Sequence, residues 1–466
     1  MQLRLLGLLA GLLGLGAALS AQGNQLLVVL EEEADKSKYS QFWADLEDRG
    51  YAITYRAPKD TTLSLFLHGQ PAYHHLLLLP TQSKGLGPAL TPNLIVDFVN
   101  AGSNVLLALS ADHSVPSAIS SLLLELDISL PPDRTSLVVD HFHHDTAHAS
   151  DAHDVLLLPS PHFPADTKNF FAVDGLIAFP RAVGAVLGNA SPLLASILPA
   201  PRTAYTYNPH DDAESMADVF ATGAQLSLVT AFQARNSARF TVLGSADALT
   251  DTAFTAPVQP ASAQTPSAPA NRAFAQKLTS WTFMETGVLR VGEVQHRLDE
   301  SDSVPAEPNP AIYRIKNKVH YSIALSEWTT DHWAPFTPPP HSPVQLEFSM
   351  LSPFHRLDLS PSTPTPNSTL FETAFRVPDH HGIFNFLVEY RRPFYTVVED
   401  KRTVTVRHFA HDEWPRSFVI TGAYPWLAGI WVTVAGWVGF VALWVFSKPG
   451  VARRDLRVGG GRGKGR

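Results

Sequence analysis

The first third of the chain alternates short apolar runs with amphipathic segments. The apolar runs predict strands at residues 26–30, 52–55, 76–79 and 105–109, and the amphipathic segments predict helices at 39–49, 91–100 and 117–126. Strands without polar alternation are typical of a parallel sheet that helices cover on both faces, because neither face meets water. The pattern therefore predicts a doubly wound, Rossmann-like α/β domain.

The same pattern continues more loosely through the middle of the chain. A strand is expected at residues 240–244 and a helix at 272–283, and residues 255–271 between them are rich in Pro, Ala and Ser. A segment with so few large apolar residues is expected to be a surface loop or a disordered insert. We place the α/β domain at residues 22–286, with 255–271 as its low-complexity loop.

From residue 287 the pattern changes to short alternating strands that prolines interrupt. The expected strands cover residues 319–325, 344–350, 370–377, 383–390 and 403–407. Alternation with a period of two, and turn residues between the strands, predict an antiparallel β-sandwich. We place this second, β-rich domain at residues 287–420.

Both ends of the chain carry membrane-targeting patterns. Residues 424–446 form a stretch without charged residues, which is long enough to cross a bilayer as a helix. Residues 447–466 form a basic tail, which the positive-inside rule places in the cytoplasm. Near the start, Arg4 precedes a leucine-rich run and the small residues Ser20 and Ala21, so residues 1–21 are predicted to be a signal peptide that is cleaved after one of these two. Together these segments predict a single-pass type I membrane protein.

Composition limits the classes of function. The 466 residues carry a formal net charge of −8, with 35 Lys and Arg against 43 Asp and Glu. Nucleic-acid binding rests on clustered positive charge, so it is not expected. The chain has no cysteine, which excludes a cysteine nucleophile and a thiolate metal site.

Ordered segments along nearly the whole chain resemble one family, the 48 kDa or WBP-type subunit of eukaryotic oligosaccharyltransferase. The resemblance rests on FWADLEDRGY at 42–51, VVDHF at 138–142, FQARNSARF at 232–240, GSADALTDTAF at 244–254, GVLRVGEVQHR at 287–297, YSIAL at 321–325, VQLEFSMLSPFHR at 344–356, VPDHHGIFNFLVEY at 377–390 and AYP at 423–425. One departure follows VVDHF, where His143 and His144 stand in place of the Asn and Tyr often found in the family.

The resemblance implies a non-catalytic subunit in the endoplasmic reticulum membrane. The complex transfers an oligosaccharide from dolichyl diphosphate to Asn in Asn-X-Ser/Thr, and the chemistry belongs to a separate multi-spanning subunit that uses a divalent metal. This chain is then expected to bind no cofactor or metal and to have no catalytic residue. Its implied partners are the other subunits, the catalytic one included, with the protein translocation channel as a further candidate.

A rival hypothesis is a stand-alone, membrane-anchored lumenal hydrolase or glycan-binding protein. It would use Ser110, which follows the strand at 105–109, or a His- and Asp-rich segment that offers imidazole and carboxylate ligands. That segment contains Asp140, His141, His143, His144, Asp145, His148, Asp151, His153 and Asp154. Ser110 lacks the flanking glycines of a nucleophile elbow, which favours a helix cap or loop serine, and His-rich polar loops are commonly only solvated.

Two arginines in FQARNSARF, Arg235 and Arg239, have two interpretations. They would contact an acidic glycan-diphosphate headgroup, or they would pair with carboxylates between the domains. Because the segment has no glycine-rich phosphate cradle, we favour the structural interpretation.

Modification, packing and retrieval signals complete the set of candidate residues. Asn189 and Asn367 begin glycosylation sequons, and the proline after the first sequon disfavours it. In the predicted span, Ala435 and Gly439 form a small-xxx-small pair that would admit a neighbouring helix. Arg462 and Lys464 are a candidate retrieval signal in the tail.

Overall fold

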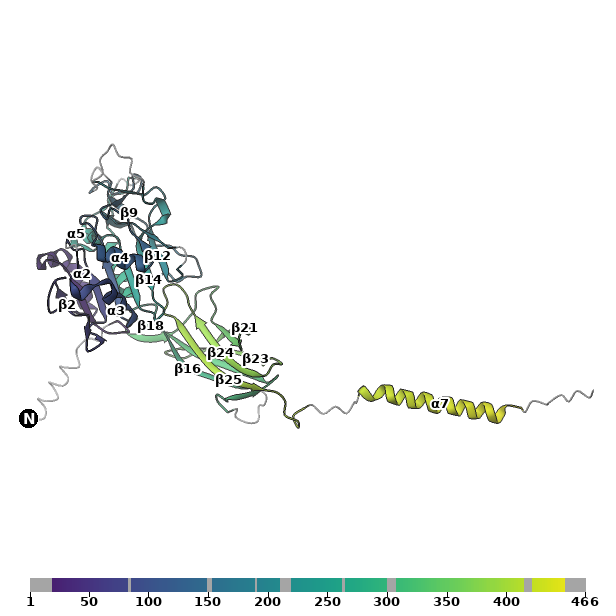
Figure 1. The fold of residues 1–466 in the computed structure, drawn as a ribbon. Coiled ribbons are helices and arrows are strands. Elements are labelled where there is room, and N and C mark those ends of the chain that lie inside the picture. Colours follow the sequence, from purple (N-terminus) through teal and green to yellow (C-terminus); the bar gives the residue numbers. More distant parts are fainter. Residues whose placement is uncertain are drawn as a thin grey trace, which may run out of the picture. The chain divides into compact units, whose positions relative to one another are not determined.

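The structure is a computed structural model of the chain. It describes residues 19–82, 85–148, 153–188, 191–209, 219–261, 265–299, 307–414 and 421–448. The chain forms two compact units, Met1–Arg407 and His408–Arg466, which Figure 1 traces in sequence order. The first unit holds mixed α/β and β-rich domains, and the second holds one apolar helix.

A nine-stranded mixed sheet forms the centre of the α/β domain. Its order is β2-β1-β5-β6-β15-β14-β11-β7, with β12 paired to β14. Neighbours from β2 to β15 are parallel, whereas β14, β11, β7 and β12 join antiparallel. The strands are β1 (Gln25–Val29), β2 (Ala52–Arg56), β5 (His75–Leu78), β6 (Asn104–Ala108), β7 (Ile128–Ser129), β11 (Ala185–Leu187), β12 (Leu194–Pro199), β14 (Leu226–Gln233) and β15 (Arg239–Leu243).

The predicted strands of this domain are confirmed to within one residue at each end, but an entirely parallel sheet is wrong. The cause lies in the connection between β14 and β15. Only residues 234–238 separate the two strands, and a short turn can join only antiparallel neighbours.

Helices cover both faces of the sheet, because successive strand residues point to opposite sides. In β1, Leu26 and Val28 lie in one core with residues of α2 and α6, and Leu27 and Val29 lie in a second core with residues of α3 and α4. The helices are α2 (Ser40–Asp48), α3 (Pro92–Asn100), α4 (Ser117–Glu125), α5 (Asp251–Thr255) and α6 (Asn271–Thr282), with 3₁₀ turns η1 (Glu33–Tyr39), η2 (Pro88–Leu90), η3 (Gly223–Gln225) and η4 (Ala246–Leu249).

Smaller elements border this sheet. Three two-stranded ladders pair β3 (Phe66–Leu67) with β4 (Gln70–Pro71), β8 (Leu137–Val139) with β13 (Tyr205–Tyr207), and β9 (Val155–Leu158) with β10 (Ile177–Pro180). In the Pro/Ala/Ser-rich stretch, Val258 and Ser267 exchange two backbone hydrogen bonds of 2.9 and 2.8 Å. Asn271, predicted to end that stretch, instead begins α6 and is buried.

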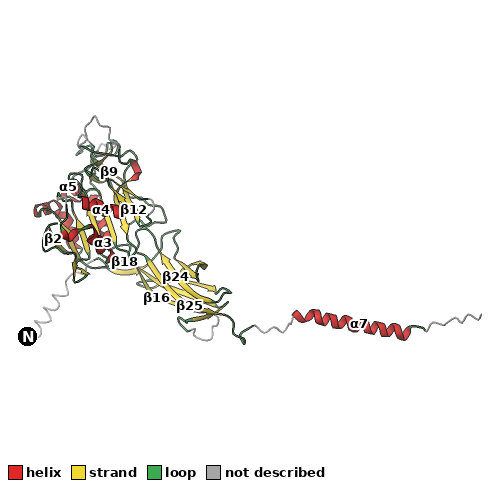
Figure 2. Cartoon of the chain, in the orientation of Figure 1, coloured by secondary structure: helices red, strands yellow, loops and turns green. Residues whose placement is uncertain are grey.

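The β-rich domain consists of two five-stranded sheets (Figure 2). One has the order β16-β18-β23-β22 with β19 on β18, and the other has the order β17-β25-β24-β20-β21. Tyr321 of the first sheet stacks on Phe386 of the second, with ring centroids 5.4 Å apart. The strands are β16 (Leu289–Leu298), β17 (Ile312–Arg314), β18 (Lys318–Thr329), β19 (His332–Pro335), β20 (Gln345–Ser349), β21 (Pro353–Asp358), β22 (Ser360–Pro364), β23 (Thr369–Arg376), β24 (Gly382–Tyr390) and β25 (Val398–Arg407).

The second unit contains η5 (Thr421–Ala423) and α7 (Tyr424–Phe446). Helix α7 has 23 residues, and at 1.5 Å per residue it extends about 35 Å, enough to cross the hydrocarbon core. Within the described ranges it is the single candidate for a membrane span.

Candidate functional sites at the two edges of the α/β sheet

The carboxyl edge of the parallel strands contains a cavity of about 760 Å³. We define this edge as the ends of β1, β5, β6 and β15 together with the loops that follow. Open α/β sheets bind their ligands at such an edge. Acidic and basic residues line much of the cavity, together with one histidine: Lys38, Asp112, Asp145, Asp154, Arg181, Asp247, Asp251 and His148.

The charged groups at the carboxyl edge bind one another. The guanidinium of Arg181 contacts Asp112 and lies 2.9 Å from Asp247 Oδ2. Burial raises the pKa of Asp247, and the positive charge of Arg181 opposes that rise. Asp251 accepts hydrogen bonds from the backbone N–H groups of Ser40 and Gln41 at 3.1 and 2.8 Å, so it caps the start of α2.

Ser110 lies at this edge but has the contacts of a loop serine. Its hydroxyl donates to Asp247 Oδ2 at 3.4 Å and accepts from the N–H of Asp112 at 3.3 Å. A nucleophilic serine needs a neighbouring base that an orienting group holds in place. Within the described part of the chain, no histidine is hydrogen-bonded to Ser110, so the geometry does not favour the nucleophile hypothesis.

The predicted His- and Asp-rich cluster divides into separate groups. Asp140 is fully buried and accepts from Phe142 N at 2.8 Å, Thr203 Oγ1 at 2.7 Å and His143 Nδ1 at 2.9 Å. Burial opposes ionisation of Asp140, but these hydrogen bonds together lower its pKa. Asp145 is likewise buried and bonds His148 at 2.9 Å. Both carboxylates therefore order their own loops.

The remaining histidines form a compact group with Tyr205. The Nδ1 atoms of His141 and His153 are 2.6 Å apart, His144 stacks on His153 with ring centroids 3.9 Å apart, and His141 Nε2 is 2.9 Å from the Tyr205 hydroxyl. Burial and the neighbouring histidines lower the pKa of His144. Two ring nitrogens this close are hydrogen-bond partners of each other. Among the described residues no group of three or more His, Cys, Asp or Glu has the arrangement of a metal site, and Asp151 lies outside them.

The amino edge, where the parallel strands begin, carries a buried polar network that the sequence did not predict. His75, Asn104 and Arg239 begin the adjacent strands β5, β6 and β15, and all three are fully buried. Asn104 Nδ2 donates to His75 Nδ1 at 3.2 Å, and Asn104 Oδ1 accepts from Arg239 N at 2.9 Å. His75 Nε2 lies 3.0 Å from the carbonyl oxygen of Gly23. Because a carbonyl oxygen only accepts, Nε2 carries the ring proton and donates it. Burial lowers the pKa of His75 to about 3, which keeps the ring neutral.

The side chain of Arg239 joins the α/β domain to the β-rich domain. Its guanidinium contacts the carbonyl of Trp281 at the end of α6, the carbonyls of Thr286 and Gly287 at 2.8 and 2.9 Å, and that of Phe394 at 3.4 Å. It also lies 4.7 Å from the centroid of the Trp281 ring. Burial lowers the pKa of Arg239 to about 9. The headgroup role is wrong for Arg239, which is buried. The favoured structural role between the domains is confirmed, although the partners of Arg239 are carbonyls instead of carboxylates. Arg235 is exposed.

Phe394 is a residue through which the β-rich domain contacts Arg239 and Trp281, and we call this contact between the domains the joint. It lies in the loop between β24 and β25 with a φ of 66°, a conformation that non-glycine residues rarely adopt. Its carbonyl accepts a hydrogen bond from Trp281 Nε1 at 2.8 Å. The centroid of its ring lies 4.9, 5.0 and 5.7 Å from the ring centroids of Phe163, Phe171 and Trp281. The buried ring and the bonded carbonyl together fix the two domains.

Of the other predicted site residues, the structure describes Asn367, Ala435 and Gly439. Asn367 is exposed in the turn between β22 and β23, and Thr369, the third sequon residue, is buried at the start of β23. Ala435 and Gly439 lie four residues apart on α7 and hence on one face of it. Asn189, Arg462, Lys464 and most of residues 1–21 lie outside the described residues.

The fold and these sites define a class: a two-domain protein with one candidate membrane span among the described residues and a buried polar network that joins its domains. The chain belongs to the OST48 family, since residues 17–285 match the OST48 N-terminal domain and residues 296–448 match the OST48 middle domain.

Relatives from several kingdoms match over most of their length. The dolichyl-diphosphooligosaccharide--protein glycosyltransferase subunit wbp1 of Schizosaccharomyces pombe is 33% identical, over 94% of this chain and 95% of the relative. The 48 kDa subunits of Arabidopsis thaliana and Caenorhabditis elegans are 31% and 33% identical, each over 91% of this chain and over 93% and 92% of theirs. The resemblance seen in the sequence is confirmed.

Proposed function

We propose that this chain is a non-catalytic subunit of the oligosaccharyltransferase complex, which transfers a preassembled oligosaccharide from dolichyl diphosphate to Asn in Asn-X-Ser/Thr. The observation that carries the proposal is the similarity to wbp1, which spans 94% of this chain and 95% of that subunit. Its role is assembly and stability of the complex. No nucleic acid takes part.

Two structural observations support a non-catalytic role. At the carboxyl edge, Arg181 is engaged by Asp112 and Asp247, and the hydroxyl of Ser110 donates to Asp247. At the amino edge, Arg239 binds carbonyl groups of both domains. The polar side chains at both edges therefore bind other groups of the same chain, as expected for a structural subunit of a larger assembly.

The proposed arrangement is type I in the endoplasmic reticulum membrane. Residues 1–21 act as the signal peptide, residues 22–286 and 287–420 are the lumenal domains, residues 424–446 are the span and residues 447–466 are the cytoplasmic tail. The finer fold types are a doubly wound, Rossmann-like α/β domain and a β-sandwich. Arg462 and Lys464 belong to a retrieval signal. Asn367 is a better glycan acceptor than Asn189, because its sequon has Thr and lies in an exposed turn, whereas a proline follows the sequon of Asn189.

Partner subunits, the catalytic multi-spanning one among them, are proposed to pack against Ala435 and Gly439 of α7, with the translocation channel as a further contact. A Cβ added at Gly439 would have no described atom within 4 Å, so the chain's own fold tolerates a larger side chain there. Gly439→Leu is therefore expected to leave the ectodomain folded and to reduce co-purification of partners, because small residues let helices approach closely. Co-purification equal to that of wild type would contradict this packing face.

The proposal is tested by isolating the tagged chain from digitonin-solubilised membranes and measuring oligosaccharide transfer to an Asn-X-Thr peptide. Activity is expected in the co-purified assembly and absent from the chain purified alone. Activity of the isolated chain that Ser110→Ala or His141→Ala abolishes would instead establish the stand-alone hydrolase. For the assembly, both variants are expected to preserve transfer.

A further inference from the structure

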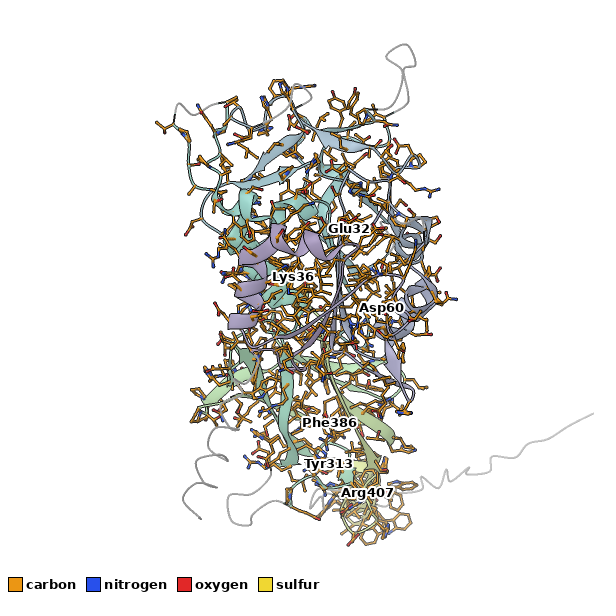
Figure 3. The ribbon with its side chains drawn as sticks, turned by 90° about the vertical axis from the view of Figure 1, so that its left-hand side faces the viewer. Glu32, Lys36, Asp60, Tyr313, Phe386 and Arg407 are labelled. Atoms are coloured by element: carbon orange, nitrogen blue, oxygen red, sulfur yellow. The ribbon has the colours of Figure 1, made fainter. Side chains whose placement is uncertain are left out.

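The two ends of the β-rich domain differ in what they contact. One end carries the loop between β24 and β25, where Phe394 meets the α/β domain. At the other end β24 begins and β25 finishes, since Gly382 pairs with Val406. Figure 3 shows Arg407, the last residue of β25, beyond Tyr313 and Phe386 at this second end. The chain continues from Arg407 to the apolar helix.

Large apolar side chains are exposed at this second end. Leu351 is 103% exposed relative to an extended reference, Ile383 is 63% exposed, Ile312 is 57% exposed and Phe354 is 37% exposed. We call these four residues the apolar tip. A folded protein rarely leaves neighbouring apolar side chains in water without a partner for them.

Strand register and close contacts bring the members of the apolar tip together. Ile312 and Ile383 both pair with Thr405, so they flank it on one face of the sheet. The turn that holds Leu351 touches the start of β24, because a Cβ on Gly382 would lie 2.6 Å from Met350 Sδ. The Phe354 ring packs 5.4 Å from that of Phe384 on β24. Ile383 and Phe384 point to opposite faces of β24, so Phe354 borders the other face from Ile312 and Ile383, and the four residues share one end of the domain instead of one face.

Basic side chains lie at the same end of the domain as the apolar tip. Arg376 and Arg407 are exposed at the ends of β23 and β25, and Lys316, two residues before β18, forms an ion pair of 2.9 Å with Asp379. Apolar side chains bordered by cations suit the boundary between acyl chains and phosphate groups in a bilayer.

We propose that the apolar tip rests on the phospholipid surface and inserts Leu351 and Ile383 into it. The inference depends on the membrane anchor proposed above. Residues 408–423 separate Arg407 from the start of α7, and such a segment spans at most roughly 55–60 Å when fully extended. This length only limits how far that end of the β-rich domain can lie from the start of α7.

The absence of native cysteine makes a site-specific test direct. The full-length chain carrying Leu351→Cys or Ile383→Cys is labelled with an environment-sensitive fluorophore and reconstituted in phosphatidylcholine nanodiscs. Lipids with a nitroxide near the headgroup should quench both labels by about half or more, because the tip would enter the interfacial layer ~5–10 Å deep. The matched control is Leu124→Cys on α4, where the native side chain is 66% exposed.

A second control separates the inference from the proposal on which it rests. Val441→Cys lies inside the span, so its label should be quenched by nitroxides deep in the acyl region. If that label is not quenched, the membrane anchor itself is wrong, and the tip proposal fails with it. The label at 441 can be quenched by lipid nitroxides while the labels at 351 and 383 are quenched only by aqueous iodide, like the control label at 124. That result would overturn the tip proposal alone.

Discussion

The two edges of the α/β sheet use arginine in opposite ways. At the carboxyl edge, Arg181 is 39% exposed and faces the carboxylates of Asp112 and Asp247 beside a large cavity. At the amino edge, Arg239 is fully buried and binds carbonyl groups of both domains. Enzymes built on such sheets use the carboxyl edge for ligands. Here the amino edge carries the fully buried polar groups and the contacts with the β-rich domain, which indicates that this edge of the sheet holds the second domain.

The largest expected effect follows from removing the guanidinium of Arg239. Arg239→Ala leaves a cavity and several buried carbonyls without a donor, and it should reduce the free energy of unfolding by on the order of 4 kcal/mol. Arg239→Lys keeps a charge but not the planar fork, so it should recover only part of the loss. Thermal unfolding of the detergent-solubilised full chain measures both. If Arg239→Ala reduced the free energy of unfolding by less than the exposed control Arg235→Ala does, Arg239 would not stabilise the joint.

Removing the ring of Phe394 tests the same joint from the β-rich side. Phe394→Ala should reduce the free energy of unfolding by about 3 kcal/mol, since a buried aromatic contact with three other rings is lost. Limited proteolysis should then cut the connection between the domains faster than in wild type. Phe354→Ala at the exposed end of the same domain is the control and should leave that rate unchanged.

Acid should weaken the amino edge through His75. The unfolded state takes up a proton below a pKa of about 6.5, whereas the folded state does so only near 3. The unfolded state therefore binds more protons between these values, and stability falls as the pH drops through 6.5 toward 3. At pH 5.5 the loss from this ring should be about 1.4 kcal/mol relative to neutral pH.

The variant His75→Gln isolates this contribution, because its amide can still donate and accept but does not titrate. Denaturant unfolding at pH 7.5 and 5.5 should show a smaller acid-induced loss in the variant than in wild type. Equal losses in the two chains would show that His75 is not kept neutral by burial.

The strands of the first third, the apolar span and the change to a β-rich domain could be predicted because each depends on a local pattern of apolar residues, whereas β14 and β16 were not predicted. The polar network at the amino edge could not be predicted from the sequence. His75 and Asn104 are single polar residues before apolar runs, and they meet only because β5, β6 and β15 are neighbours. The partners of Arg239 are backbone carbonyls, which leave no signature in sequence. No strand was predicted at β22, because prolines are expected to interrupt strands, although edge strands tolerate proline.

The smallest expected effect lies at the carboxyl edge. Arg181→Gln removes the contacts to Asp112 and Asp247, but all three side chains are partly exposed, and such pairs contribute only about 0.2–1 kcal/mol. The pKa of Asp247 should rise further once the positive charge that opposes its rise is gone. Thermal unfolding at neutral pH should therefore shift little, and oligosaccharide transfer by the co-purified assembly should persist. Loss of transfer with an intact assembly would show that the cavity binds a ligand, and the contrast between the two edges would then fail.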